Sequence, residues 1–391
     1  MTSDKPILLF CAGEDSGDSI GESLVRFAKN KLGSGVRLLG AGGRRMVAEG
    51  LSPVVEFDDL PVSGFGDILP RYFRLKKSFN TLRRILKNPE CKGLVAIDYP
   101  GFNMKLVALA HQLKKPVFYV APPQVWAWKQ KRSKKLAFKE IHLACFFDFE
   151  EQAYRNAGCN VVRIQHPLVQ NFHSYIEPKK NRTCDEEILL FPGSREGQAL
   201  RNLSFFLKVI NSLRDELLFS SSLASFPKVV VMASRESLKF SLEKNLKILL
   251  GEKPSYPVHV ESVPLDFPTR KNRFEKALCA LSIPGTVSIE LALSGCNTVV
   301  CTVPDKLTYF IGKRLVKTEC FALPSLILNR KIFPEHIVAS PSADAIGKVS
   351  KDLQRIMSSS LDCEISKSLE GRLLEGMTVE QSMSEFLAKF F

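Results

Sequence analysis

The chain lacks the features that mark several classes of protein. It begins MTSDKPILLF, which has neither the basic start nor the long apolar region of a secretory signal, and no apolar run is long enough to cross a bilayer. No two of its ten cysteines have CxxC spacing, and most lie in apolar runs, as buried thiols of a reducing compartment do. Metal-ligand spacing is absent, and among the six histidines only His166, at a strand end, is a candidate site residue. We therefore expect a cytoplasmic protein without a bound metal.

The net charge is strongly positive. Lysine and arginine number 55 against 41 acidic residues, a balance of +14 at pH 7. Such a charge requires an anionic partner: nucleic acid, phospholipid headgroups or a phosphorylated substrate. Six of the eleven residues from Lys129 to Lys139 are basic, and the only two tryptophans, Trp126 and Trp128, lie just before them. Indole rings beside cations suit a membrane interface, while a solvated basic helix beside two core tryptophans, and RNA binding, are the alternatives.

Apolar segments rich in β-branched residues alternate with helical patterns, which is typical of parallel α/β sheets. A polar stretch at 172–187 interrupts this alternation and is interpreted as a linker. We expect doubly wound domains at 1–171 and 188–345, and C-terminal helices at 346–391 that pack back toward the N-terminal domain. Ligands of such folds bind at the carboxyl ends of the strands, so the site is expected in a cleft between two sheets. The expected strands are about 7–11, 37–40, 94–97, 117–121, 141–147 and 161–164 in the first domain, and 188–191, 229–233, 258–260, 278–283 and 298–303 in the second.

Two glycine-led turns in the second half have the form of phosphate sites. Residues 188–195 read ILLFPGSR, in which a strand enters a tight turn and then a helix. Gly193 lets a ligand approach the backbone, Ser194 can cap the helix, and Arg195 adds a forked cation beside N–H groups that attract an anion. Further along, Pro284-Gly285-Thr286 repeats the arrangement. A Pro-Gly-Ser sequence is also a common turn without a ligand.

Glu290 lies one helical turn after Thr286, on the same face of the expected helix. A carboxylate is too negative for a phosphate but suits the two hydroxyls of a ribose. Turns that bind phosphate, together with a carboxylate that binds ribose, indicate a nucleotide. A solvated acidic helix residue is the structural alternative.

The first half offers an acidic loop and a candidate base. The first strand leads into residues 12–18, AGEDSGD, which is neither a dinucleotide fingerprint nor a Walker loop; its carboxylates suit sugar hydroxyls or the cap of the next helix. Asp98 ends the strand at 94–97, and Pro100 favours an extended Tyr99 that holds the acid at the strand terminus. A carboxylate there can accept a proton from an attacking alcohol, as sugar transfer to a hydroxyl requires, or it can serve as a cap.

In combination these motifs resemble one family, the lipid-A-disaccharide synthases. The resemblance rests on AGEDSGD at 12–18, GAGGRRM at 40–46, AIDYPGFN at 96–103, PQVWAWKQKR at 123–132, LFPGSR at 190–195 and KRLVKTE at 313–319. It implies a GT-B glycosyltransferase, with two Rossmann-like domains facing each other across a cleft, which is inverting, independent of metals and cofactors, and peripheral at the cytoplasmic face of the inner membrane. The implied reaction transfers 2,3-diacylglucosamine from UDP-2,3-diacylglucosamine to the 6-hydroxyl of 2,3-diacylglucosamine 1-phosphate (lipid X), giving the β-1,6-linked disaccharide 1-phosphate and UDP.

The resemblance also implies roles for single residues. Asp98 matches the general base, and the two turns match the UDP site, formed by Gly193, Ser194, Arg195, Gly285, Thr286 and Glu290. We expect the acceptor sugar to contact Glu14, Ser16, Asp18 and Asn103. Acyl chains and membrane are expected at Phe65, Leu69, Phe73, Trp126, Trp128, Lys129 and Arg132, although a buried amphipathic helix is the alternative for residues 62–79. The expected partners are the two acylated sugars and inner-membrane phospholipid, without nucleic acid, and a homodimer is left open.

The chain departs from the family's pattern at several positions. Where the family has serine, glutamate, glycine, a hydrophobic residue and glutamine, the chain has Pro284, Gln198, Gln165, His336 and Val338. These substitutions bear on donor affinity and acyl preference, but Asp98 and Arg195 are intact, so activity is expected. The alternatives are another UDP-sugar transferase, a UDP-sugar epimerase and, more distantly, a non-catalytic protein that binds RNA or anionic membrane.

Overall fold

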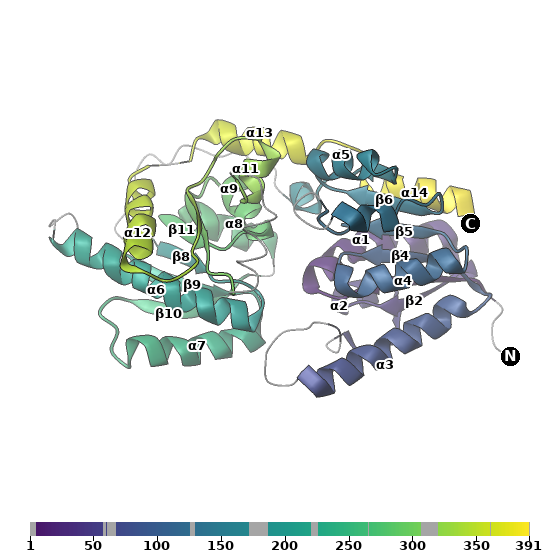
Figure 1. Cartoon of the computed structure of the whole chain (residues 1–391), viewed down its shortest axis with the longest axis horizontal. Helices are drawn as coiled ribbons and strands as arrows, with labels where there is room; N and C mark the ends of the chain where they lie inside the picture. Colours follow the sequence, from purple (N-terminus) through teal and green to yellow (C-terminus); the bar gives the residue numbers. More distant parts are fainter. Residues whose placement is uncertain are drawn as a thin grey trace. The chain divides into compact units, whose positions relative to one another are not determined.

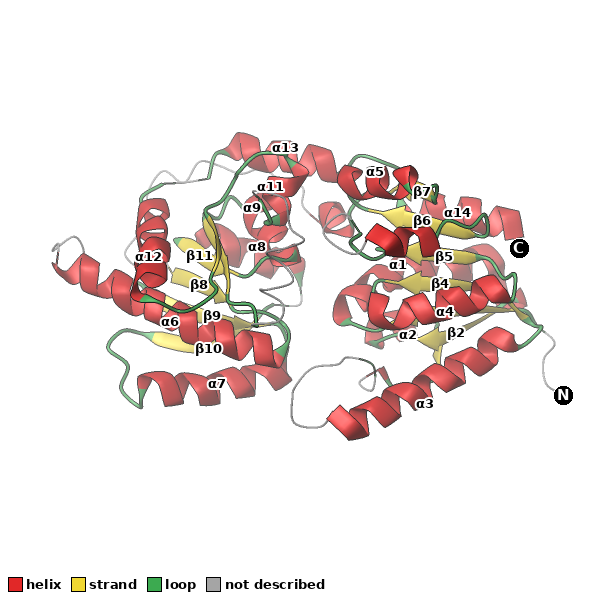
Figure 2. Cartoon of the chain, viewed as in Figure 1, coloured by secondary structure: helices red, strands yellow, loops and turns green. Residues whose placement is uncertain are grey.

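The structure is a computed structural model that describes residues 5–57, 60, 68–125, 130–171, 187–219, 226–264, 266–305, 320–359 and 361–390. The chain forms two compact units, residues 1–167 with 373–391, and residues 168–372. Each unit is built on one parallel sheet with helices packed against it (Figures 1 and 2). The first unit therefore contains both ends of the chain.

The first unit has seven parallel strands in the order β3-β2-β1-β4-β5-β6-β7. Because β1 pairs with both β2 and β4, the order of strands reverses between β1 and β4. The strands are β1 (Ile7–Ala12), β2 (Arg37–Ala41), β3 (Ser52–Pro53), β4 (Cys91–Ile97), β5 (Val117–Val120), β6 (Ile141–Cys145) and β7 (Asn160–Arg163). The helices are α1 (Asp15–Leu32), α2 (Arg44–Ala48), α3 (Ile68–Lys87), α4 (Pro100–Gln112), α5 (Asp148–Asn156) and α14 (Val379–Phe390).

The second unit repeats this topology with six parallel strands, in the order β10-β9-β8-β11-β12-β13. Its order reverses between β8 and β11. The strands are β8 (Glu187–Phe191), β9 (Lys228–Ala233), β10 (Val258–Ser262), β11 (Cys279–Ser282), β12 (Thr298–Thr302) and β13 (Glu335–Ile337). The helices are α6 (Glu196–Phe219), α7 (Glu236–Leu250), α8 (Phe267–Lys276), α9 (Thr286–Leu293), α11 (Leu323–Ile327), α12 (Ala343–Met357) and α13 (Cys363–Leu373).

The central strands are apolar on both faces because helices cover both sides of each sheet. In β8, Ile188 and Leu190 belong to one hydrophobic cluster, whereas Leu189 and Phe191 belong to another. Successive strand residues point to opposite faces, so these clusters lie on opposite sides of the sheet. This two-sided burial explains why the strands read as continuous apolar runs. The predicted pair of doubly wound, Rossmann-like α/β domains is confirmed.

Two details differ from the expectation. The short strands β3 and β13 were not predicted. Helix α14 packs on α1 and β6 of the first unit, but α12 packs on α6 and β12 of the second, so the expected return of residues 346–391 to the N-terminal domain is wrong for α12. The polar stretch interpreted as a linker lies outside the described residues except for Glu187, which begins β8. Within the described ranges, no helix is long and apolar enough to span a bilayer.

Candidate functional site

The candidate residues gather at the two points where the strand order reverses, one in each sheet. In the first unit the acidic loop follows β1 and Asp98 follows β4, and the register pairs Ala12 with Ile97. In the second unit the two glycine-led turns follow β8 and β11, and Phe191 pairs with Ser282. Adjacent parallel strands that end in register bring their following loops to one edge of the sheet, which is where ligands of such folds bind.

Asp98 occupies a strained turn between β4 and α4. Its φ is 47°, and that of Tyr99 is 50° with ψ 55°, so two successive non-glycine residues are left-handed. The prediction of an extended Tyr99 is therefore wrong. Pro100 biases Tyr99 away from the right-handed helical region and toward an extended conformation, but the turn into α4 overrides this bias and is left-handed at Tyr99. Such residues cost about 1–3 kcal/mol each, and they are frequent at active sites.

The backbone of Asp98 is held by three residues on two elements, β5 and α4. Its N–H donates to the Val120 carbonyl (2.9 Å), and its carbonyl accepts from Asn103 Nδ2 (2.8 Å) and Tyr119 Oη (3.1 Å). Asn103 Nδ2 also lies 3.1 Å from the carbonyls of Cys11 and Ile97. Asn103 is fully buried, so the structure corrects its predicted role as a sugar ligand: its amide joins the ends of β1 and β4.

The first turn of α1, which follows β1, contacts the carboxylate of Asp98. Ser16 is exposed, and its hydroxyl donates to Asp98 Oδ2 over 3.4 Å. Glu14 is half-buried at the N-cap of α1. A Cβ on Gly13 would lie 2.1 Å from Cδ1 of Tyr99, so only glycine allows the tyrosine ring to pack there. The loop and the Asp98 turn therefore depend on each other for their conformation.

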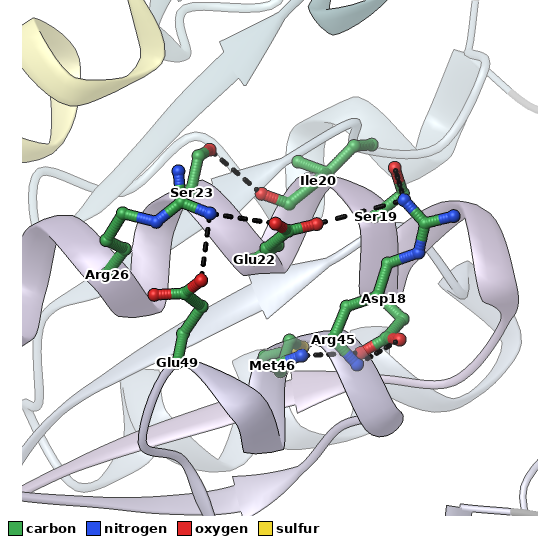
Figure 3. Close-up of polar contacts among 9 residues, drawn as sticks. All are labelled: Asp18, Ser19, Ile20, Glu22, Ser23, Arg26, Arg45, Met46 and Glu49. Atoms are coloured by element: carbon green, nitrogen blue, oxygen red, sulfur yellow. Dashed lines mark hydrogen bonds and ion pairs between the residues drawn. The ribbon is translucent and has the colours of Figure 1, made fainter. Parts of the chain in front are cut away.

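Asp18 is used by the fold (Figure 3). It is buried, and its Oδ2 and Oδ1 accept from the backbone N–H groups of Arg45 (3.1 Å) and Met46 (3.2 Å), which caps α2. Gly43 makes this approach possible, because a Cβ there would lie 2.5 Å from Asp18 Oδ2. Ion pairs from Arg26 to Glu22 (2.8 Å) and Glu49 (2.9 Å) extend the tie between α1 and α2. The predicted contact of Asp18 with a sugar is therefore corrected to a structural role, which also explains the GAGGRRM motif.

The turn after β8 has the backbone geometry of an anion site. Gly193 has φ 126°, a value closed to most other residues, and Ser194 and Arg195 are exposed just before α6. Asn202, fully buried in α6, donates to the carbonyls of Pro192 (3.1 Å) and Gln198 (2.9 Å) and accepts from the N–H of Val303 (2.8 Å). Asn202 was missed by the sequence interpretation. It fastens the turn to the end of β12 as Asn103 fastens the Asp98 turn.

The described part of the chain leaves space around Gly285 in the turn after β11. A Cβ on Gly285 would meet no described atom within 4 Å, and Thr286 is exposed at the start of α9. One turn later Glu290 is largely buried, and its Oε2 lies 2.5 Å from Arg270 Nε of α8. Arg270 Nη1 also donates to the carbonyl of Pro264 (2.9 Å), so the ion pair is anchored. Burial raises the pKa of the Glu290 carboxyl, and Arg270 opposes that rise.

Arg270→Gln is expected to make UDP binding more sensitive to acid. Without the guanidinium the pKa of Glu290 rises further, and a protonated carboxyl is a poorer acceptor for ribose hydroxyls than an ionised one. The dissociation constant for UDP should therefore begin to increase at a higher pH in the variant than in the wild type as the solution is acidified. Calorimetric titration of both proteins with UDP at a series of pH values below neutrality checks this. Identical pH profiles would remove Glu290 from the ribose site.

Other predicted positions fall elsewhere. Phe65, Trp126, Trp128 and Lys129 lie outside the described residues; Leu69 and Arg132 lie in α3 and in the short helix Gln130–Lys135, but their side chains are not described. Phe73 of α3 is 61% exposed.

His166 is buried against Phe146 and Phe147, and burial lowers its pKa to about 4, so it has a core position. Within the described part of the chain, no group of three or more His, Cys, Asp and Glu could hold a metal ion.

Three of the departures from the family pattern have evident surroundings. His336 Nε2 lies 2.8 Å from Asp352 Oδ2, and Val338 is buried in the core of the second unit. Gln198 lies beside Gly193: its Oε1 would be 3.4 Å from a Cβ placed there. Gln198 is thus the departure closest to the turn after β8.

Known proteins resemble the chain over most of its length. The lipid-A-disaccharide synthase of Chlamydia pneumoniae is 30% identical over 335 residues, which cover 83% of this chain and 53% of that protein, so the chain spans about half of that relative. The lipid-A-disaccharide synthase of Geobacter metallireducens is 27% identical over 355 residues, covering 88% of this chain and 87% of the relative. The solved structure of the glycotransferase of kitacinnamycin matches with a TM-score of 0.54 at 12% identity, over 99% of both chains.

The structural likeness concerns the fold, and it confirms the predicted GT-B class. Residues 8–385 match the family described as Lipid-A-disaccharide synthetase. This match spans both units and all six of the motifs that carried the sequence resemblance. The predicted family, a glycosyltransferase family of lipid A biosynthesis, is thereby confirmed. The chain belongs to the lipid-A-disaccharide synthetase family.

Proposed function

We propose that the chain transfers 2,3-diacylglucosamine from UDP-2,3-diacylglucosamine to the 6-hydroxyl of 2,3-diacylglucosamine 1-phosphate. The observation that carries this proposal is that different functional groups lie at the two points where the strand order reverses. The end of β4 presents a carboxylate beside a serine, and the ends of β8 and β11 present two glycine-led turns at helix starts. A sugar transferase needs one of each, because the acceptor must lose a proton and the donor must release a diphosphate.

In this proposal Asp98 is the general base. As the acceptor oxygen attacks C1 of the donor sugar, its proton passes to the Asp98 carboxylate, the C1–O bond to UDP breaks, and the configuration at C1 inverts. Ser16 donates to Asp98 Oδ2 and so keeps the carboxylate oriented. Glu14, at the N-cap of α1, and the exposed Ser16 are the remaining candidates for a contact with a sugar hydroxyl.

The second unit is proposed to hold UDP. Gly193, Ser194 and Arg195 supply backbone N–H groups and a cation to the diphosphate, and Gly285 and Thr286 add the start of a second helix. Glu290 accepts from the ribose hydroxyls. The charge that develops on the leaving diphosphate is thus met by helix N-termini and a guanidinium, and we propose that the transfer needs no metal ion.

We also propose that the enzyme is peripheral on an anionic membrane surface. The exposed Phe73 lies on α3 beside three basic residues of the same helix, Arg74, Lys76 and Lys77. An exposed ring among cations suits a surface of anionic lipid, from which both acylated substrates would be drawn. We further propose that the enzyme is a homodimer.

The experiment combines purified protein with both acylated sugars in mixed micelles and with their non-acylated counterparts. UDP release and a new disaccharide 1-phosphate are expected with the acylated pair alone. Turnover of non-acylated sugars at an equal rate would instead favour a transferase with a soluble acceptor. The same purified protein, without micelles, should sediment with anionic vesicles and be released from them by high salt. If the protein stays in the supernatant, the membrane proposal is contradicted.

A further inference from the structure

We infer that Tyr119 and Asn103 are positioning residues for the proposed reaction: two buried side chains that hold the backbone of Asp98 so that its carboxylate stays beside Ser16. This inference rests on the proposed role of Asp98 as the base. Both side chains donate to the carbonyl oxygen of Asp98, at 3.1 Å from Tyr119 Oη and 2.8 Å from Asn103 Nδ2. They therefore act through the backbone of the base.

The Asp98 turn needs such restraint because its conformation is strained. A left-handed aspartate followed by a left-handed tyrosine persists only when the surroundings over-determine it. The N–H of Asp98 is bonded to Val120 and fixes the preceding peptide, whereas the carbonyl of Asp98 belongs to the next peptide, so donors on that carbonyl help to fix the plane of the next peptide. With two donors on that oxygen, rotation of the peptide breaks two hydrogen bonds from fully buried residues at once.

Rotation of this peptide would also move the carboxylate. The side chain leaves the same Cα whose dihedral angles define the turn, so a relaxed turn points the carboxylate away from the sheet edge. A displacement of about 1 Å at a catalytic group can lower a rate by a factor of about one hundred. Precise placement is therefore what the two donors contribute to the reaction.

The hydroxyl of Tyr119 has no packing reason to be present. Tyr119 is fully buried on β5, whose sequence is VFYV, and a phenylalanine ring would fill the same core volume. A buried hydroxyl is costly unless it is bonded, and this one bonds the carbonyl of the candidate base. Asn103 is likewise a polar residue on the apolar face of α4, at helical spacing from Leu106, Val107 and Ala110.

The test is Tyr119→Phe with Tyr154→Phe as its matched control. Tyr154 is equally buried in the same unit, and its hydroxyl also donates to a backbone carbonyl, that of Pro123. Both variants lose one such hydrogen bond, so their thermal unfolding temperatures should fall by similar amounts. For Tyr119→Phe we expect kcat to fall about tenfold or more, with KM for both substrates within about twofold of the wild type, because placement and not binding is lost. Tyr154→Phe should keep kcat within about twofold.

Two further variants make the outcome decisive. Asn103→Ala removes the other donor and should lower kcat more than Tyr119→Phe; if it does not fold, Tyr119→Phe alone decides. In an Asp98→Asn background, Tyr119→Phe should cause no additional loss, because its effect acts through the ionised base. Equal kcat for Tyr119→Phe and the Tyr154→Phe control, or a further drop in the Asp98→Asn background, would overturn the inference. Full activity of Asp98→Asn itself would instead overturn the proposed base, so the two failures are distinguishable.

Discussion

Asp98→Ala should lower the rate of UDP release by a factor of about 10²–10⁴, the contribution typical of a general base. The reason is chemical, since the acceptor hydroxyl loses its proton acceptor while the donor turns of the second unit are untouched. Asp98→Asn should have a similar effect, because the amide keeps the size of the side chain but accepts no proton. The measurement is initial-rate UDP release with both acylated sugars at saturation.

Binding and folding must survive for this result to bear on mechanism. UDP affinity and the thermal unfolding temperature of both Asp98 variants should match the wild type, since Asp98 is half-buried and the backbone hydrogen bonds of its turn do not involve its carboxylate. Ser16→Ala is a milder variant with which the activity loss of the Asp98 variants can be compared. It removes one 3.4 Å donor to Asp98 Oδ2 and should cost much less than loss of the carboxylate. An Asp98 variant with unaltered turnover would assign the proton transfer to another group.

The strands could be predicted from the sequence because they are long and buried on both faces. Residues 7–10 and 188–191 are unbroken apolar runs, a pattern that a strand covered on both sides produces. The two-residue β3 and three-residue β13 have no run long enough to stand out. Placement of Asp98 at a strand end followed directly from the position of β4. The left-handed conformation of Asp98 and Tyr99 could not be predicted, because a proline biases the residue before it toward extended conformations.

Roles that depend on distant partners were beyond the sequence. Asp18 looks like any acidic residue in a glycine-rich loop, but the N–H groups that it caps are 27 and 28 residues away, on α2. The sequence did contain a signal for the two buried asparagines that hold the turns, Asn103 and Asn202. Asn103 and Asn202 each fall on the apolar stripe of an amphipathic helix, and a polar residue there is buried only if it is hydrogen-bonded. That rule would have separated Asn103 from the candidate sugar ligands.

Gly193→Ala should raise the dissociation constant for UDP by about tenfold or more. At φ 126° an L-residue carries a strain of about 1–3 kcal/mol, which is worth a factor of about five to more than one hundred if it falls on the bound state. The added Cβ would also lie 2.9 Å from Ile283 Cδ1, at the end of β11. A shift of the Ile283 side chain can relieve the contact, but the backbone strain is relieved only when the turn rotates, and rotation turns its N–H groups away from the diphosphate.

Gly347→Ala provides the control in the same unit. Gly347 lies within α12, has no positive φ, and a Cβ there would meet nothing within 4 Å, so alanine should stabilise the helix by up to about 1 kcal/mol and leave UDP binding unchanged. Calorimetric titration of both variants with UDP alone isolates the nucleotide from the acyl chains and from Asp98. If Gly193→Ala binds UDP as tightly as Gly347→Ala, the turn after β8 is not the diphosphate site. If Gly193→Ala weakens UDP binding but retains binding of the acceptor, the two substrates bind at separate strand-order reversals. A mutation in a single shared site would weaken the binding of both substrates.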